Sequence, residues 1–150
     1  MNFIINENRK NMGLIMNQFT ILQNKFDQFS QNLNINNMNN HQELKGKKYG
    51  IKWRYVGQVV NGLREGKGIL YGDNCDRYEG DYRNDKKEGK GIYYFNSGDR
   101  YEGDFRNNKK EGKGIYYYHG DRMMGNYYNG KEIGKKVTLT RNGEVKINNY

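Results

Sequence analysis

The sequence contains no proline and only one cysteine, Cys75, among its 150 residues. A single cysteine excludes an intrachain disulfide and suits a reducing compartment. No apolar run approaches the roughly 18 residues that cross a bilayer. The N-terminal residues lack the apolar core and cleavage site of a signal peptide, and position 2 is not the glycine that myristoylation requires. We therefore expect a soluble protein of the cytoplasm.

The chain is also poor in aliphatic residues. Its hydrophobic fraction is 34% and its mean hydropathy is −1.18, so a thick apolar core is not expected. Yet it has 14 tyrosines, six phenylalanines and one tryptophan, which are too many for a simply disordered chain. Since one aromatic side chain can bury about 150–250 Å², aromatic residues must supply much of the burial.

Charge and composition divide the chain near residue 45. Residues 1–44 carry three basic and three acidic side chains, so the net charge of +9 lies entirely in residues 45–150. All 14 tyrosines and 19 of the 20 glycines also lie there, whereas the first 40 residues hold 12 asparagines. The two regions are therefore expected to fold differently.

The N-terminal segment, residues 1–33, is predicted to form an amphipathic helix from about residue 5. Its apolar residues alternate at spacings of three and four, which is a heptad stripe over about three heptads. This helix would pack on its own domain, dock on a partner, or pair with a second copy as a homodimeric coiled coil. The asparagine-rich residues 34–48 are interpreted as a linker. The predicted helix interface consists of Met12, Ile15, Phe19, Leu22, Phe26, Phe29 and Leu33.

The C-terminal region, residues 49–150, contains an internal repeat. Residues 78–100 recur as residues 101–122, and over the first 17 positions the copies differ only at Tyr82/Phe105 and Asp85/Asn108. A looser copy spans 55–77 and a degenerate copy spans about 123–145. A fixed period of 23 residues indicates an array in which each unit packs on its neighbours.

Each repeat is predicted to form two strands. In the second repeat, residues 78–84 form one strand, 85–88 a tight turn and 89–95 the return strand. A symmetric turn then places Tyr82 opposite Gly91 and Gly80 opposite Tyr93, so that rings cover exposed glycine backbone.

This arrangement gives a sheet with one aromatic face and one charged face. A single layer leaves the aromatic face half open, and such a face usually binds a partner. The predicted partner-binding face consists of Tyr55, Tyr78, Tyr82, Tyr93, Phe95, Tyr101, Phe105, Tyr116, Tyr118 and Tyr127.

A basic edge is predicted where Lys86, Lys87, Lys109 and Lys110 fall at the hairpin tips. These lysines are either solvated turn charges that keep sheet edges apart or an edge that attracts anionic lipid headgroups. Nucleic acid fits less well, because neighbouring acids dilute the positive field and no nucleic-acid-binding motif is present.

No residue pattern indicates catalysis, a metal or a cofactor. The recurrent Gly-Lys-Gly segments lack the remaining residues of a phosphate-binding loop and a following helix. His41, His119 and Cys75 do not have the spacing of metal ligands or of a nucleophile with its base. We therefore expect a protein that is not an enzyme and needs no metal or cofactor.

The pattern Tyr-Glu-Gly-x-aromatic, then Gly-x-Gly, then Gly-Asp-x, resembles the MORN repeat (membrane occupation and recognition nexus) over about residues 55–145. The resemblance implies a mainly β fold: an elongated, single-layer antiparallel sheet of β-hairpins, here preceded by the N-terminal helix. It also implies scaffold roles in cytoskeletal, ciliary or membrane-junction assemblies, and phosphoinositide binding has been proposed for the family.

Two functions follow as expectations. The first is a non-catalytic scaffold of a cytoskeletal assembly, ciliary or axonemal, that docks a helix on its aromatic face. The alternative is a peripheral membrane module that binds anionic phospholipids through the basic edge.

Overall fold

A computed structural model of the chain describes residues 13–14, 17–18, 20–22, 24, 42–48 and 50–149. These residues belong to two units, Met1–Asn32 and Leu33–Tyr150. In the first unit every described residue is helical, in agreement with the predicted helix. Of these residues, Leu22 alone is partly buried, and it is also the one that belongs to the predicted stripe. The other six residues of that stripe lie outside the described residues.

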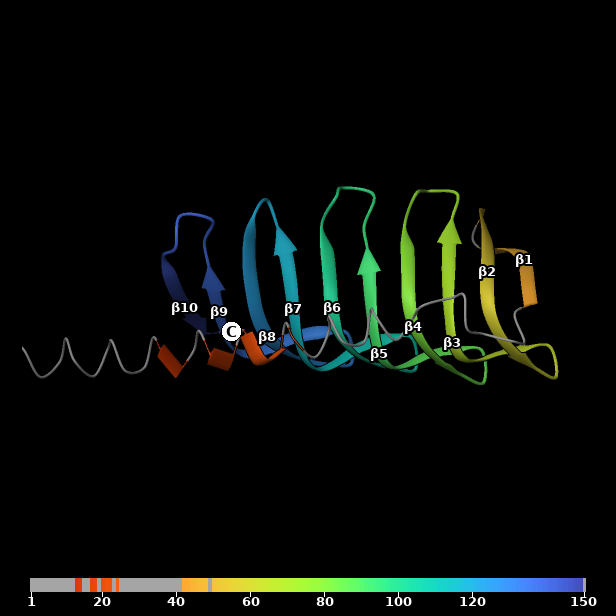
Figure 1. Cartoon of the computed structure of the whole chain (residues 1–150), viewed down its shortest axis with the longest axis horizontal. Coiled ribbons are helices and arrows are strands. Elements are labelled where there is room, and N and C mark those ends of the chain that lie inside the picture. The colour runs from red at the N-terminus through yellow and green to blue at the C-terminus, as the bar shows by residue number, and fades with distance from the viewer. Residues whose placement is uncertain are drawn as a thin grey trace, which may run out of the picture. The chain divides into compact units, whose positions relative to one another are not determined.

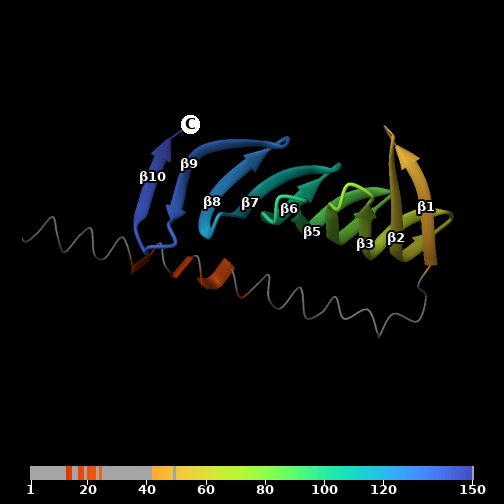
Figure 2. The ribbon, with the colours of Figure 1, turned by 90° about the horizontal axis from the view of Figure 1, so that it is seen from above.

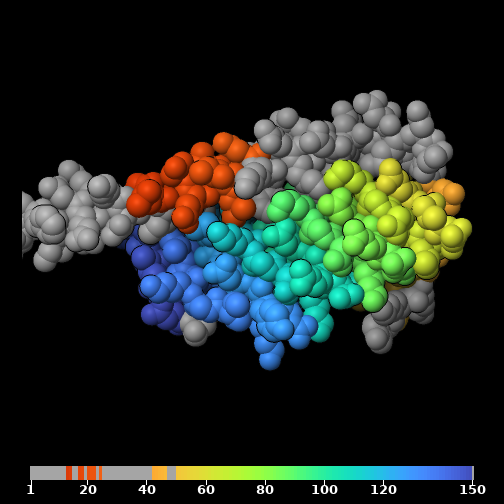
Figure 3. Space-filling model, turned by 90° about the horizontal axis from the view of Figure 1, so that it is seen from below, coloured from red at the N-terminus to blue at the C-terminus, as the bar shows by residue number. Residues whose placement is uncertain are grey.

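The second unit is one ten-stranded antiparallel sheet in which each strand pairs with the next one along the chain (Figure 1). The repeats follow one another in chain order along the sheet (Figure 3). The predicted mainly β, single-layer fold of hairpins is therefore confirmed. The strands are β1 (Gln42–Lys48), β2 (Ile51–Val60), β3 (Leu63–Gly72), β4 (Arg77–Arg83), β5 (Lys86–Tyr94), β6 (Arg100–Arg106), β7 (Lys109–Tyr118), β8 (Asp121–Tyr128), β9 (Lys131–Leu139) and β10 (Val145–Asn149).

Strand β1 lies within the segment that the sequence analysis interpreted as a linker. It pairs with β2 along its whole length, and Leu44 stands opposite Tyr55. Leu44 also packs against the buried core. Pairing with β2 and this apolar contact together explain why residues 42–48 are a strand although their composition is polar.

The hairpin turns are shorter than predicted. Asn84 and Asp85 have φ angles of 48° and 64°, and Arg83 pairs with Lys86, so the turn has two residues in the left-handed region. Such turns match the right-handed twist of the flanking strands. Residues 86–88, which the sequence analysis placed in the turn, therefore belong to β5.

The shorter turn shifts the pairing by two residues. Tyr78 pairs with Tyr93 and Gly80 with Gly91, so the predicted pairing of Tyr82 with Gly91 is wrong. Because the shift is even, each residue keeps the face that was predicted for it. A bulge between Gly80 and Tyr82 then accommodates the extra residues of β5.

As a result, a row of glycines crosses the sheet, whose strands curve along their length (Figures 1 and 2). Successive members pair directly, and the ring of Tyr78 lies on Gly80 and Gly91, its neighbours in the row. The rings of Tyr55 and Tyr101 occupy the same place in the adjacent repeats. The row consists of Gly57, Gly68, Gly80, Gly91, Gly103, Gly114 and Gly125.

Above this row lies the core, a ladder of six buried rings. Consecutive rings meet edge to face, with centroids 5.0–5.4 Å apart and interplanar angles of 78–89°. Such geometry is favourable because the positive edge of one ring meets the negative face of the next. The second and third repeats each contribute two consecutive rings, and the first and fourth units contribute one ring each. We call this set the ring ladder: Tyr55, Tyr82, Tyr78, Phe105, Tyr101 and Tyr127, in spatial order.

Charged side chains couple each repeat to the next. Lys67 Nζ lies 3.1 Å from a carboxylate oxygen of Asp81, and Lys90 Nζ lies 2.6 Å from that of Asp104. The recurrent glutamate acts similarly, because Glu88 accepts a hydrogen bond from the backbone N–H of Asn107 at 3.1 Å. Lys67 and Lys90, together with these acids, thus have structural roles between repeats.

The opposite face is covered by arginine–tyrosine stacks. The guanidinium of Arg77 lies 4.2 Å from the ring centroid of Tyr94, and that of Arg100 lies 3.9 Å from that of Tyr117. Arg100 also donates to buried Glu102 at 2.6 Å. The mixed charges predicted for this face therefore neutralise one another locally.

We predict that Gly91→Ala lowers the free energy of unfolding by about 3 kcal/mol. A Cβ at this position would lie 2.6 Å from Cζ of Tyr78, and the ring cannot move because its neighbours enclose it. Gly125→Ala is the matched control, since at this position only the flexible end of Glu132 must move, and its expected cost is below about 1 kcal/mol. Denaturant unfolding measures both, and equal costs would contradict the role of the seated ring.

We also predict that Tyr82→Phe leaves stability unchanged or raises it by up to about 1 kcal/mol. The hydroxyl of Tyr82 is buried and has no hydrogen-bond partner within the described part of the chain, and burying such a group costs free energy. The third repeat already carries Phe105 at the equivalent position. Tyr78→Phe is the control, because its hydroxyl donates to the carbonyl of Asp81 at 3.2 Å and its loss should cost about 1 kcal/mol.

Candidate binding site on the aromatic face

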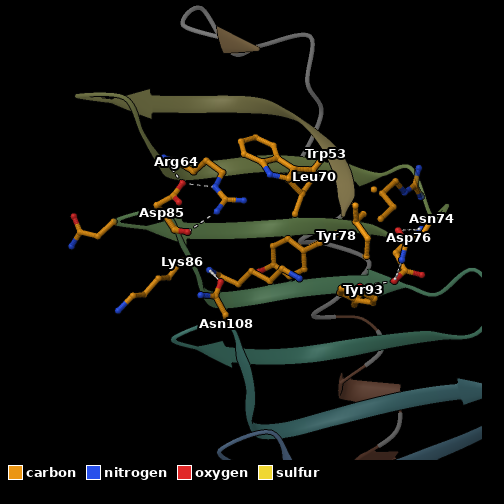
Figure 4. A pocket seen from close by; sticks show the side chains of 15 residues that line it. Trp53, Arg64, Leu70, Asn74, Asp76, Tyr78, Asp85, Lys86, Tyr93 and Asn108 are labelled. Atoms are coloured by element: carbon orange, nitrogen blue, oxygen red, sulfur yellow. Dashed lines mark hydrogen bonds and ion pairs between the residues drawn. The ribbon is translucent and has the colours of Figure 1, made fainter. Parts of the chain in front are cut away.

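A cleft of about 700 Å³ opens on the aromatic face of the first two repeats. Trp53, Leu70, Tyr78 and Tyr93 supply apolar surface from neighbouring strands (Figure 4). Charged and amide side chains stand at its two ends: Arg64, Asp85, Lys86 and Asn108 at the hairpin turns, and Asn74 and Asp76 at the opposite end.

The structure divides the predicted partner-binding face into two sets. The first is the ring ladder, whose six members are at most 7% exposed and so are shielded from a partner. They come from the first strand of each hairpin, β2, β4, β6 and β8, and each ring is enclosed by the rings next to it in the ladder. The second set, Tyr93, Phe95, Tyr116 and Tyr118, is accessible to different degrees, and Tyr118 is 45% exposed.

Two accessible residues, Trp53 and Leu70, were not predicted as part of this face. Both are partly buried and pack against the ladder. Leu70 could have been found, because it occupies the position of Tyr93 in the repeat alignment. Trp53 precedes the first recognisable repeat, so no periodic signal marks it. We call the accessible set the open band: Trp53, Leu70, Tyr93, Phe95, Tyr116 and Tyr118.

A row of cations borders the ladder on the same face. Arg64 lies 5.0 Å from the ring centroid of Tyr82. The ammonium of Lys87 lies 4.6 Å and 4.3 Å from the centroids of Tyr78 and Tyr93. Lys110, one repeat further on, lies 4.4 Å from the centroid of Tyr101. We call Arg64, Lys87 and Lys110 the cation row; cations over ring faces are favourable because each ring face carries negative charge density.

The predicted basic edge is therefore wrong for two of its four lysines. Lys87 and Lys110 lie on the aromatic face, because the two-residue turn pairs them with Tyr82 and Phe105, whose rings are on that face. Only Lys86 and Lys109 are exposed at the turns, where their ammonium groups donate to Asn107 and Asn129 of the next turn at 3.2 Å and 2.6 Å.

Burial changes the proton affinities of this face. It lowers the pKa of Lys87 to about 8, with a further lowering by the nearby charge of Arg64. Burial also lowers the pKa of Lys110, although Glu132 opposes this. In contrast, burial raises the pKa of Tyr55 to about 12 and raises the pKa values of Tyr78, Tyr82 and Tyr101.

Two kinds of feature are of interest among the described residues: clusters of metal-ligating side chains and helices that could cross a membrane. No group of three or more histidine, cysteine, aspartate or glutamate side chains comes together there to hold a metal ion. Nor do the described helical residues include a helix with the length and hydropathy of a bilayer crossing. Cys75 is exposed and free.

Comparison with known families accounts for this architecture. The model of the MORN repeat matches residues 55–75, 78–100 and 101–121. The chain carries three MORN repeats. A comparison with curated proteins finds no match for it. MORN repeats generally act as protein- or membrane-interaction modules and are typically non-catalytic. The degenerate unit at 123–145 lies outside the match, but the β8–β9 hairpin continues the sheet there.

We predict that the free energy of unfolding rises between pH 8 and about pH 10 and falls at higher pH. Over the first interval the unfolded chain binds a proton at Lys87 that the folded chain has released, so raising the pH favours folding. Above pH 10 tyrosines ionise in the unfolded chain while burial keeps those of the ladder protonated, so stability is lost. Urea unfolding at fixed pH values measures this profile.

The control for this profile is Lys87→Met. It should reduce the rise between pH 8 and pH 10 and leave the fall at higher pH, where phenolate absorbance of the unfolded chain reports the ionisation. A rise of the same size in the variant would show that Lys87 titrates normally.

Proposed function

We propose that this chain is a non-catalytic scaffold subunit of a cytoskeletal assembly, of the ciliary or axonemal kind, and that its aromatic face docks an amphipathic helix. The observation that carries the proposal is the open band: a set of accessible aromatic and aliphatic side chains beside a cleft, in which the rings of Tyr93, Phe95 and Tyr116 lie in contact. Exposed apolar surface of this kind marks interaction sites.

The dimensions of the sheet suit a helix that crosses the strands. Ten strands separated by about 4.8 Å extend over about 43 Å, and a helix of 29 residues extends over about 44 Å. Tyr78, Tyr93 and Tyr101 stand in one row, so equivalent residues of successive repeats are two strand spacings, about 10 Å, apart. One heptad of an α-helix rises about 10.5 Å. A heptad stripe would therefore meet the same surface once per repeat.

Two sources of such a helix exist: a partner protein and the heptad segment of residues 1–33, from this chain or from a second copy. Support for the membrane alternative is weaker, because two of the four lysines of the predicted edge lie over rings. Lys86 and Lys109 remain for contact with an anionic surface.

We predict that a synthetic amphipathic helix of four heptads with a leucine stripe binds the full chain. Trp53, the only tryptophan, lies in the cleft, so its fluorescence should change saturably. The double variant Tyr93→Ser, Tyr116→Ser should weaken binding at least tenfold, because two side chains of the open band are lost. Tyr128→Ser, which removes a 65% exposed ring outside this band, should bind normally.

Two further measurements accompany this experiment. Deletion of residues 1–40 retains β1 and tests the N-terminal segment; unchanged stability, oligomeric state and peptide affinity would remove that segment from the proposal. Flotation with anionic vesicles at low salt tests the membrane alternative. Vesicle binding that is lost in Lys86→Gln, Lys109→Gln, together with no peptide binding by the full chain, would contradict the proposed function.

A further inference from the structure

Lys87 and Lys110 differ from the other lysines of the repeats in what surrounds their ammonium groups. Lys67 and Lys90 face aspartates of the next repeat, and Arg64 faces Asp85 at 2.6 Å. Among the described residues, neither Lys87 nor Lys110 forms an ion pair, and their ammonium contacts are with ring faces. An ammonium group has three donors and accepts nothing, so rings alone leave its hydrogen-bonding capacity unused.

We propose, on the basis of the function proposed above, that Lys87 and Lys110 each receive a carboxylate of the docked helix. The aromatic face thus binds a partner helix that carries an acidic residue at every seventh position. The carboxylates would sit beside the apolar stripe of that helix, which covers the open band.

The seven-residue spacing follows from the fold. Lys87 and Lys110 occupy equivalent positions of adjacent repeats, which lie about 10 Å apart. On a helix, residues seven apart share one face and are separated by about 10.5 Å, whereas residues three or four apart are separated by only about 5–6 Å. Two acids seven residues apart therefore match the two ammonium groups, and closer pairs do not.

Docking would also strengthen the two ion pairs. Each ammonium lies over rings on one side, and the helix would cover it on the other, so less water screens the pair than on an open surface. The ammonium of Lys87 is already largely removed from water, and this burial lowers its pKa. Among the described residues, the charged groups that act on Lys87 are Arg64 and Asp76, and Asp76 accepts hydrogen bonds from the hydroxyl of Tyr93 at 2.8 Å and the N–H of Asn96 at 2.9 Å.

The charge along the cation row changes sign at the fourth hairpin, which gives the docked helix a preferred direction. The fourth hairpin carries Glu132 opposite Tyr127, at the position where the earlier hairpins carry Lys110 and Lys87. An acid of the helix placed there would meet a carboxylate, which is unfavourable. The docked helix should therefore carry acids along the first repeats and a neutral or basic residue beside Glu132.

This pattern excludes the chain's own N-terminal segment as the helix that is recognised. Residues 1–33 contain two acids, Glu7 and Asp27, which are 20 positions apart. No pair of acids in that segment has the spacing of Lys87 and Lys110. The occupant that complements the cation row is consequently a helix of another protein.

The test uses the full chain and three synthetic helices of four heptads with the same leucine stripe. The first has glutamate beside the stripe once per heptad, the second has glutamine at those positions, and the third has the same glutamates on the far face. Fluorescence of Trp53 gives the affinities at neutral pH and low salt. The first helix should bind at least tenfold more tightly than either of the others, and this advantage should shrink as the pH rises above that at which Lys87 loses its proton.

Variants of the chain localise the effect. Lys87→Met, Lys110→Met should remove the preference for the first helix, and Lys87→Arg, Lys110→Arg should keep it. Lys86→Met, Lys109→Met is the matched control, because it removes the same charge from the adjacent, exposed lysines and should keep the preference. Urea unfolding confirms that each variant is folded.

The outcomes separate this inference from the proposed function. If none of the helices binds, the proposed function fails, and the inference fails with it. If all three helices bind equally, or if the Lys87→Met, Lys110→Met variant retains the preference, the helix docks but Lys87 and Lys110 do not recognise its acidic residues. Binding of vesicles of phosphatidylserine and phosphatidylcholine that requires Lys87 and Lys110, without a preference among the helices, would assign the two lysines to lipid headgroups and overturn the inference.

Discussion

The seating of a tyrosine ring on a pair of facing glycines is the contact on which the rest of this structure depends. Without Cβ atoms at Gly80 and Gly91, the ring of Tyr78 lies directly on the backbone, and its hydroxyl reaches the carbonyl of Asp81. Tyr82, from the same strand, and Phe105, from the next repeat, can then meet it edge to face. A sheet one layer thick thus obtains a core without a second layer to cover it.

The same arrangement determines where a partner can bind. The rings of the ladder are buried against one another, so a partner can reach only the side chains of the open band. These side chains recur beside the ladder in successive repeats. The cations of Lys87 and Lys110 lie between the buried and the accessible rings. Apolar surface and positive charge therefore recur together at the period of the repeat, which favours a ligand that is itself periodic.

The sequence predicts the repeat, the antiparallel hairpins and the two faces, because each depends on residue type at a fixed interval. It fails on the register, since the run of Asp85, Lys86, Lys87 and Glu88 is polar enough to be read as a four-residue turn. The real turn relies on left-handed Asn84 and Asp85, and a bulge beside positive-φ Gly89 absorbs the remaining residues. A register error of two residues leaves each residue on its predicted face. It places Lys86 and Lys87 in the turn, however, whereas both belong to β5. It also pairs the wrong rings with the glycines.

In the ladder, Tyr82 of the second repeat stands between Tyr55 of the first and Tyr78 of its own, and Phe105 of the third stands between Tyr78 and Tyr101. No single repeat therefore contains a complete core. An isolated 23-residue unit would bury too little surface to fold alone. Much of the folding free energy therefore comes from the interfaces between neighbouring repeats. The folding of each repeat is coupled to that of its neighbours, as in a one-dimensional nearest-neighbour model. Amide exchange should accordingly be slowest in the middle hairpins and quicken toward both ends, where a unit has one neighbour.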